Sequence, residues 1–290
     1  MTPLRRKMIE DMGLAGLASS TQQVYVQAVA QMARHLDKSP ARMSEEELRR
    51  YFVYLTRERK VSRPTWKVAI CATKFLFEHT LRRPWSTLRM VRPPREKKLP
   101  VVLSRAEVWK LLDQVSDAVI AGCLTMLYCC GLRVEEGRHL SVEDIDRSRM
   151  LIRVRGKGNK ERNIPLGQAA LPVLERSWKV HRHPRWIFAS CCRAELRSDW
   201  EQRGWPVGRH ALARALHEAC DNAGIRKAVH LHTLRHCYAT HLMEAGVPLR
   251  AIQEYLGHRS LSSTAIYTHL TSVVEAGALD PINGLLSRPR

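Results

Sequence analysis

The hydrophobic positions in the first 60 residues repeat at helical spacing. From residue 25, after a Ser-Ser-Thr start, five apolar residues fall at i, i+3, i+4, i+7 and i+11, which places them on one face of a helix. A second helix is predicted after residue 44, because Ser44 and Glu47 have the spacing of a capping box that satisfies the first N–H groups. The apolar face of the first helix comprises Tyr25, Ala28, Val29, Met32 and Leu36.

A third helical pattern, over residues 63–81, carries two different faces. One face is mostly apolar and predicts contact with a core, whereas the other is basic. A basic face of this kind could contact DNA phosphates, or it could simply be solvated. The first face contains Trp66, Ala69, Ile70, Thr73 and Phe77, and the second contains Arg63, Lys67 and Lys74.

Residues 82–103 separate this helical region from the rest of the chain. The prolines at positions 93, 94 and 100 lack an amide donor and favour extended backbone, as is typical of an interdomain linker. We therefore predict a helical domain over residues 1–88, a basic proline-rich linker over 89–103 and a second domain over 104–290.

The second domain mixes helical patterns with one clear β signal. Ser104 and Glu107 form another capping-box pattern, and a mostly apolar helix follows it. Alternating apolar residues at 150, 152 and 154, a glycine-rich turn and the return "RNIPL" predict a β-hairpin. Helical patterns then dominate, roughly at 167–179, 207–223, 233–245, 248–256 and 262–270. The predicted fold class is mainly α, in two domains, with a small β-hairpin sheet in the C-terminal domain.

The charge and composition of the chain indicate which class of binding partner it has. The 290 residues include 48 Lys and Arg against 28 Asp and Glu, a net charge of +20, of which residues 1–100 supply +12. A charge so far from zero favours a polyanionic partner, either nucleic acid or an anionic membrane surface. We expect no membrane span, because no apolar run approaches roughly 20 residues, and no secretion signal. The eight cysteines lack C-x-x-C spacing and are expected to be reduced residues of a cytosolic protein.

Residues 232–242, "HTLRHCYATHL", place His232, Arg235 and His236 on one helical face at i, i+3 and i+4. Three interpretations are open: a surface cluster without a role, a zinc site that includes His230, or a site for an anion. The i, i+4 histidine spacing suits zinc, but the glutamate of H-E-x-x-H is missing. An anion site suits arginine, which offers a bidentate fork to phosphate.

Other segments carry groups that would complete a phosphate-processing site. Tyr267, nine residues after His258, has a phenolic oxygen that could act as a covalent nucleophile if cations surround the phosphate. Arg133 lies three residues before Glu136, which could orient its guanidinium, although such a pair is often only an exposed ion pair. Lys157, at the predicted hairpin tip, could give a proton to a leaving alkoxide or could be solvated.

Five motifs together, "GLRVEE", "RGKGNKERNIPL", "HTLRH", "YLGH" and "IYTH", occur in an order and with gaps that resemble the catalytic domain of the tyrosine recombinases, or phage-type integrases. The resemblance covers residues 104–270, and the basic helical region before it resembles the core-binding domain of that family. It implies a site-specific DNA recombinase with a C-shaped clamp around DNA.

The resemblance also implies the roles of individual residues. Arg133 and Arg235 would clamp the scissile phosphate, and Tyr267 would attack it to form a 3′-phosphotyrosyl link. Lys157 would be the general acid, and His232 and His258 would assist. No metal or nucleotide cofactor is implied. The partners would be double-stranded DNA sites, with four protomers in the synaptic complex and a monomer as a candidate free state. The location would be the bacterial cytoplasm, at the nucleoid when DNA is bound.

The sequence departs from the family pattern close to Arg133. Gly137 replaces a large apolar residue of the family and is expected to soften the packing behind Arg133, and Glu135 could compete for that arginine. An additional N-terminal arm-binding module is expected to be absent. For backbone contacts with DNA we expect Arg63, Lys67, Lys74, Lys160 and Arg162.

The alternatives are a type IB topoisomerase-like enzyme, a DNA-binding regulator without chemistry, and a metal-dependent nuclease. The nuclease would use the histidines or an acidic stretch, interpreted here as an exposed loop, that contains Glu143, Asp144 and Asp146.

Overall fold

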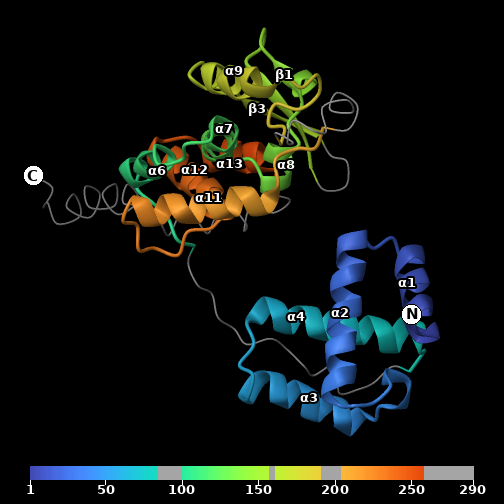
Figure 1. The fold of residues 1–290 in the computed structure, drawn as a ribbon. Helices are drawn as coiled ribbons and strands as arrows, with labels where there is room; N and C mark the ends of the chain where they lie inside the picture. The colour runs from blue at the N-terminus through green and yellow to red at the C-terminus, as the bar shows by residue number, and fades with distance from the viewer. Residues whose placement is uncertain (84–99, 157–160, 191–203, 258–290) are drawn as a thin grey trace, which may run out of the picture. The chain divides into compact units, whose positions relative to one another are not determined.

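The computed structural model describes residues 1–83, 100–156, 161–190 and 204–257 of the chain (Figure 1). The chain divides into two compact units, Met1–Lys98 and Leu99–Arg290. Each unit has its own hydrophobic core, so each can be understood by itself. No helix in these ranges is long and apolar enough to cross a membrane.

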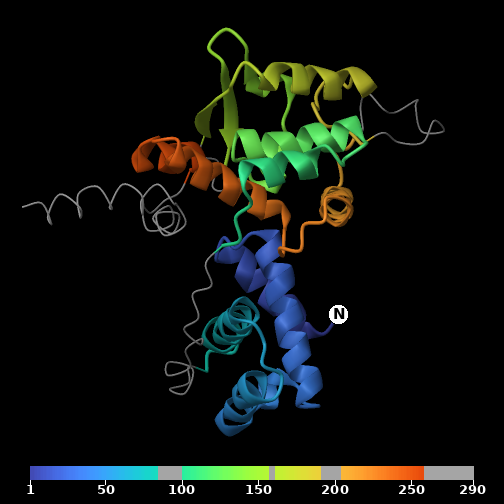
Figure 2. The ribbon, with the colours of Figure 1, turned by 90° about the vertical axis from the view of Figure 1, so that its left-hand side faces the viewer.

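The first unit is helical throughout its described part, and its longest helix, α2, packs against α4 (Figure 2). The predicted stripe from Trp66 to Phe77 is buried along α4 and the turn that follows it. The basic residues lie elsewhere on the surface of α4: Arg63 and Lys67 are exposed and Lys74 is half-buried. The elements are α1 (Pro3–Leu14), α2 (Ser19–His35), the short 3₁₀ turn η1 (Pro40–Arg42), α3 (Glu45–Arg57), α4 (Arg63–Phe75) and the π-helical turn η2 (Leu76–Thr80).

Two details of this unit bear on the sequence-based predictions. The capping box at the start of α3 is confirmed, because the Ser44 hydroxyl accepts from the Glu47 N–H and the Glu47 carboxylate accepts from the Ser44 N–H. Helix α1 was not predicted, yet it buries Met8 and Met12 in the core. Its apolar pattern is weak, and the available signal was a start motif, in which Thr2 caps the helix and Pro3 is its first residue.

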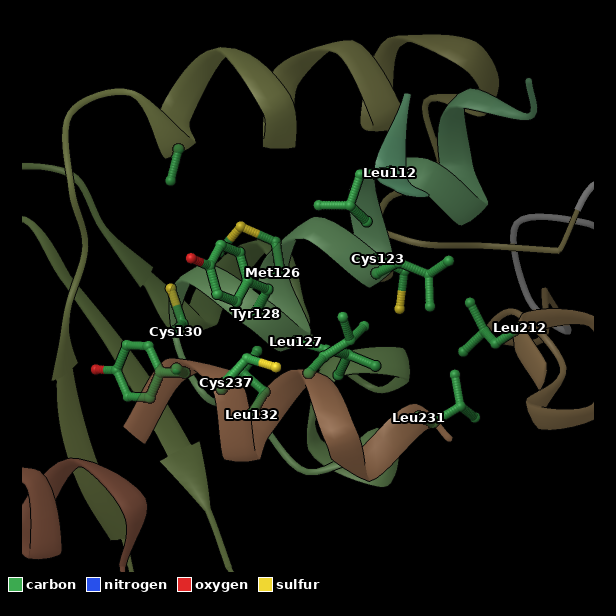
Figure 3. Packing of buried hydrophobic residues seen from close by; sticks show 14 of the residues in the cluster. Leu112, Cys123, Met126, Leu127, Tyr128, Cys130, Leu132, Leu212, Leu231 and Cys237 are labelled. Atoms are coloured by element: carbon green, nitrogen blue, oxygen red, sulfur yellow. The ribbon is translucent and has the colours of Figure 1, made fainter. Parts of the chain in front are cut away.

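The second unit is built around the apolar helix α7, which packs against α9 and α12. Figure 3 shows Cys123, Met126 and Leu127 of α7 facing side chains of neighbouring helices, among them Leu231 and Cys237 of α12. The helical elements are α6 (Arg105–Leu112), α7 (Ala118–Cys129), α8 (Val134–Arg138), the 3₁₀ turn η3 (Val142–Asp144), α9 (Ala170–His181), α11 (Arg209–Asn222), α12 (Leu231–Glu244) and α13 (Leu249–Leu256).

Three antiparallel strands complete this unit, in the order β1 (Ile145–Asp146), β2 (Leu151–Arg155) and β3 (Glu161–Pro165). Ile152 of β2 lies opposite Ile164 of β3, and both are buried, as the alternating pattern predicted. The fold class, mainly α with a small sheet in the second unit, is thereby confirmed. Of the predicted helices, the one at 262–270 lies outside the described residues.

The acidic stretch is not the exposed loop that we expected. It forms η3 and β1, and two of its carboxylates stabilise turns. Asp144 accepts hydrogen bonds from the backbone and hydroxyl of Ser141, and Asp146 accepts from Ser148 and from the Arg149 N–H. Asp and Ser side chains at turns commonly bond to the nearby backbone in this way, and here they fix the entry into the sheet.

The cysteines in the described ranges are free thiols, as predicted for reduced core residues. Burial raises the pKa of the Cys123 thiol to about 12 and that of the Cys129 thiol to about 11, so both stay protonated near neutrality. Cys123, Cys130, Cys220 and Cys237 are buried, and Cys71 and Cys129 are half-buried. Cys191 and Cys192 lie outside the described residues.

Candidate active site

Helix α12 positions the histidine and arginine cluster predicted from the sequence. Leu231 and Leu234 pack into the core, and the adjoining side of the first turns brings Arg235 to Glu136 of α8 and to the last carbonyl of α13. Three functional groups are therefore held at different depths: Arg235 is 1% exposed, His236 is half-buried and His232 is exposed. The two imidazole rings meet edge to face, with their centroids 4.8 Å apart.

Arg235 is a buried cation whose partners come from distant parts of the chain. One terminal N–H group donates to the Gly131 carbonyl at 2.6 Å and the other donates to the Leu256 carbonyl. The Glu136 carboxylate lies 3.9 Å away. A buried charge needs such partners because it has lost its hydration. Gly131 has φ +57° and no room for a Cβ atom, which would approach the Tyr238 ring to 2.3 Å.

Arg133 and Glu136 form the pair that their spacing predicted. Arg133 precedes α8 directly, and both its backbone N–H and its guanidinium donate to Glu136, at 2.8 and 2.7 Å. The Glu136 side chain is only 6% exposed, so this is not the exposed ion pair that we considered as an alternative. A second N–H of Arg133 donates to the Gly257 carbonyl at 3.3 Å, and its side chain is 39% exposed, which leaves it accessible to a ligand.

The expected competition of Glu135 for Arg133 and the expected loose packing at Gly137 are both absent from the described part of the structure. Glu135 pairs with Arg138 at 2.8 Å instead of competing for Arg133, and Arg138 also donates to the Val207 carbonyl. At Gly137 a Cβ atom would come within 2.5 Å of Leu127. Leu127 therefore fills the space that a larger residue at 137 would need, and the packing behind Arg133 is tight.

Arg162 was predicted to be a DNA-backbone contact, but its side chain points into the protein. From β3, its two terminal nitrogens donate to the Glu136 carboxylate at 3.0 and 2.7 Å. Its Nε donates to the Tyr255 carbonyl at 2.8 Å. The side chain is 11% exposed. Its hydrogen bonds and burial commit the guanidinium to the protein interior instead of presenting it as a surface cation.

Glu136 is thus the centre of a cluster of three arginines. Burial alone would raise the pKa of this carboxyl, but the hydrogen bonds and charge of Arg162, together with the bonds from Arg133, lower it to about 2. Glu136 is therefore ionised at physiological pH. Its single negative charge is shared among Arg133, Arg162 and the nearby Arg235, so the cluster keeps a net positive charge that suits an anion.

The histidines of α12 are held in their neutral form. The pKa of His232 is lowered by partial desolvation and by the charges of Arg235 and Arg133, against a smaller opposing effect of Glu136. The pKa of His236 is lowered to about 4 by burial, His232 and Arg235. A neutral imidazole near the arginine cluster can accept a proton at pH 7. Within the described ranges no three His, Cys, Asp or Glu side chains gather in a way that could hold a metal ion.

A pocket of about 1170 Å³ runs along α11 and the segment before α12, and its lining includes Val134 of α8 and His232 of α12. Apart from His230 and His232, we did not single out its basic residues from the sequence. The signal was available, because His210, Arg214 and His217 repeat at i, i+4 and i+7 opposite the buried Leu212 and Leu216. The polar side chains that line the pocket are Arg209, His210, Arg214, His217, Asp221, Arg226, Lys227, His230 and His232.

The structure therefore brings together the candidate catalytic residues Arg133, His232 and Arg235. It places with them Glu136 and also Arg162, which was expected to contact the DNA backbone. The first unit carries Arg63, Lys67 and Lys74. Four predicted site residues lie outside the described residues: Lys157, Lys160, His258 and Tyr267.

The chain has two basic units, and the second holds three arginines around a carboxylate and a pocket lined by cations, features typical of a protein that acts on nucleic-acid phosphates. Comparison with known families makes this class specific. Residues 102–273 match the phage integrase family, and residues 4–87 match the phage integrase N-terminal SAM-like domain. The chain belongs to the phage integrase family.

Individual relatives agree with this membership. A putative integrase/recombinase, y4qK, of Sinorhizobium fredii is 38% identical, with all of this chain and 91% of the relative covered. Tyrosine recombinase XerD of Halalkalibacterium halodurans is 32% identical over 88% of this chain and 89% of that protein. The crystal structure of a lambda integrase dimer bound to a core site shares the fold, with a TM-score of 0.73, 17% identity, and 91% and 93% of the two chains covered.

The protein is thus a tyrosine recombinase. It is a site-specific DNA recombinase that cleaves and rejoins DNA strands through a covalent 3′-phosphotyrosyl intermediate. This is the activity that the order of the five motifs implied, and among the alternatives considered at the outset it is the one that the comparisons support.

Proposed function

We propose that Arg133 and Arg235 bind the scissile phosphate and that Tyr267 is the nucleophile. The Tyr267 oxygen forms a bond to phosphorus, the bond from phosphorus to the 5′ oxygen breaks, and Lys157 gives its proton to that leaving oxygen. The phenolic proton passes to His232 or His258. Religation reverses these steps with a 5′-hydroxyl as nucleophile, so the cycle needs no cofactor.

The observation that carries this proposal is the convergence at Glu136. Arg133 of the α7–α8 turn and Arg235 of α12 are separated by about a hundred residues of chain, yet both reach this one carboxylate. Two guanidinium groups held by fixed partners are suited to stabilising charge that builds on a phosphate. The neutral His232 lies beside them, which supports its assignment to proton transfer.

We propose that double-stranded DNA lies along the pocket lined by α11 and reaches the arginine cluster at its end. Arg214 is largely exposed, and cations there would contact phosphates. The first unit would contact the same DNA through the basic face of α4, formed by Arg63, Lys67 and Lys74, and Lys160 would add a contact from the hairpin. The chain would act as four protomers at two DNA sites, with a monomer as the candidate free state, in the cytoplasm at the nucleoid.

A covalent-trapping experiment tests the nucleophile. The protein is incubated with nicked duplexes from its own genomic neighbourhood, so that cleavage releases a short strand and the adduct accumulates. We expect an adduct that survives denaturing electrophoresis with the wild type and is absent with Tyr267→Phe, while DNA binding is retained. Tyr255→Phe, which removes a hydroxyl from α13, is the matched control and should form the adduct. An adduct in Tyr267→Phe would refute the assignment.

The same substrates separate recombination from simple relaxation. A plasmid that carries two copies of the trapped site should yield recombinant products. Relaxation of plasmids without such a site, and without recombinants, would instead indicate a topoisomerase-like enzyme. Loss of the adduct in Arg133→Gln and Arg235→Gln, with DNA still bound, is expected if both arginines act at the phosphate.

A further inference from the structure

Three arginines meet the C-terminal end of α13 in a regular way. The carbonyls of Tyr255, Leu256 and Gly257 are consecutive, and they accept hydrogen bonds from Arg162, Arg235 and Arg133 respectively. The last carbonyls of a helix have no partner within the helix, so they attract cationic donors. Each donor reaches them from a different segment: β3, α12 and the turn before α8.

Arg162 differs from the other two arginines in how its charge is used. It binds both oxygens of Glu136, at 3.0 and 2.7 Å, whereas Arg133 contacts one oxygen with its side chain and Arg235 stands 3.9 Å away. A bidentate pair, with two parallel charge-assisted bonds, is a strong arrangement for an arginine and a carboxylate. Of the three arginines, Arg162 is therefore the one that balances the charge of Glu136 most directly.

Arg162 also packs against the glycine that ends α13. Gly257 has φ +61°, and a Cβ atom there would lie 2.9 Å from Cδ of Arg162. The aliphatic part of the arginine thus occupies the space beside the helix end, while its Nε holds the Tyr255 carbonyl. One side chain fixes β3, the centre of the arginine cluster and the end of α13 to one another.

We propose that Arg162 is a positioning residue for strand cleavage: by balancing Glu136 it leaves the charges of Arg133 and Arg235 available to the scissile phosphate. This rests on the proposed function, in which those two arginines bind that phosphate. Without Arg162, Glu136 keeps its negative charge, draws both remaining guanidinium groups toward itself and competes with the phosphate for them. The role is distinct from a DNA-backbone contact, which would act on affinity alone.

The test compares Arg162→Met and Arg162→Lys with Arg153→Met, a matched loss of an exposed arginine on the same hairpin. Adduct formation is measured at saturating protein on the nicked duplexes, and DNA affinity is measured separately. We expect Arg162→Met to bind DNA within about twofold of the wild type and to cleave roughly 10- to 100-fold more slowly, as displaced catalytic groups do. Arg162→Lys should recover part of the rate, and Arg153→Met should cleave as the wild type does.

A substrate with a neutral methylphosphonate at the scissile position distinguishes positioning of charge from general loss of structure. It carries no negative charge for the guanidinium groups to balance, so the deficit of Arg162→Met relative to wild type should shrink on it. An equal deficit on both substrates would overturn the proposal. So would a normal cleavage rate per bound complex with weaker binding and a salt slope reduced by about one, which would make Arg162 a phosphate contact.

A second comparison tests directly whether the unbalanced Glu136 carboxylate causes the loss. Arg162→Met combined with Glu136→Gln removes both charges together, and it should cleave faster than Arg162→Met alone if the unbalanced carboxylate is the cause. Additive losses would overturn the proposal; where Arg162→Met does not fold, the same comparison is made between Arg162→Lys with and without Glu136→Gln. Failure of the wild type to form a Tyr267-dependent adduct would instead contradict the proposed function, so the two failures are distinguishable.

Discussion

Glu136 shows how one carboxylate can organise a site made for an anion. It is 6% exposed and accepts from Arg133 and Arg162, with Arg235 close by. A lone buried carboxylate would be unstable as an anion, but surrounding cations make ionisation favourable. The number of cations exceeds the number of negative charges, so the carboxylate orders the guanidinium groups without neutralising all of them.

We expect replacement of Glu136 to lower the free energy of unfolding by an amount that depends on pH. The pKa of Glu136 is about 2 in the folded chain, below its ordinary value of 4.5. Its contribution to the free energy of unfolding is therefore present above pH 4.5 and disappears as the pH falls toward 2. We expect Glu136→Gln to lose about 3 kcal/mol at pH 7, as for other broken buried pairs, and the difference from wild type to shrink with acidification.

Chemical denaturation at pH 7 and at pH 3 measures that difference. Glu143→Gln is the matched control, because this glutamate is exposed on η3, and it should behave as the wild type does at both pH values. A Glu136→Gln variant as stable as wild type at pH 7 would contradict the account of the cluster.

Gly131 is the second residue whose substitution is informative. Its φ of +57° is unfavourable for alanine, and the added Cβ atom would lie 2.3 Å from a carbon of the Tyr238 ring. The Gly131 carbonyl also accepts from Arg235. We expect Gly131→Ala to lower the free energy of unfolding by about 3 kcal/mol and to reduce cleavage.

A matched glycine isolates the part of that loss caused by the collision. Gly224 has φ +68° but nothing within 4 Å of its Cβ position. Gly224→Ala should therefore lose only the backbone preference, about 1 kcal/mol. Thermal or denaturant unfolding of the two variants gives the comparison, and equal losses would show that Tyr238 yields easily.

At the scale of elements, the sequence predicted most of what depends on local pattern. The apolar stripe of α4, the capping boxes before α3 and α6 and the alternation in β2 are short-range signals, and the structure has them all. The Arg133–Glu136 pair was predicted because it spans less than one helical turn. Helix α1 was missed because its apolar pattern is weak and its burial depends on α2 and η2.

Contacts between distant elements were not predictable in the same way. Arg162 resembles any hairpin cation until β3 is placed next to α13, which reverses its expected role from surface contact to buried partner. The carbonyls at the end of α13 carry no side-chain signal at all. The periodicity of a segment reveals which side is buried, but not which neighbour covers it.

The histidines of α12 make the stability of the fold depend on pH. The pKa of His236 is about 4 in the folded chain, below its ordinary value of 6.5, and that of His232 is also lowered. The unfolded chain therefore binds protons that the folded chain excludes, and stability falls as the pH is lowered from 6.5 toward 4. We expect His236 to account for about 2 kcal/mol of this loss in the free energy of unfolding. The value is reduced for solvent screening, because the side chain is only partly buried.

Unfolding of wild type, His236→Gln and His217→Gln between pH 7 and pH 4 checks this expectation. His217 is an exposed residue of α11 and serves as the matched control. His236→Gln should flatten the pH dependence and the control should not. Parallel curves for all three proteins would show that the histidine pair is not responsible.

At the scale of the whole molecule, charge is distributed unevenly between two units that each have a core. The first unit, Met1–Lys98, holds +12 of the net +20 although it is the smaller of the two. Its hydrophobic core consists of its own residues, as is typical of a domain. The smaller unit thus combines high charge with a core of its own, a combination suited to electrostatic capture of DNA.

The basic face of α4 can be tested as a specific contact against the general effect of charge. Counterion release makes the logarithm of affinity fall linearly with the logarithm of salt concentration, with a slope of about −0.9 per phosphate contact. Replacing Arg63, Lys67 and Lys74 with glutamine should reduce the magnitude of that slope by about three if all three contact phosphates. The matched variant replaces Arg5, Arg6 and Lys7 of α1, which are also exposed and remove the same charge from the same unit. Fluorescence anisotropy over a range of salt concentrations gives both slopes.

The two slopes separate a specific contact from a general effect of charge. A reduced slope for the α4 variant alone identifies its helix face as a DNA contact, whereas equal slopes for the two variants would mean that α4 contributes no more than its charge.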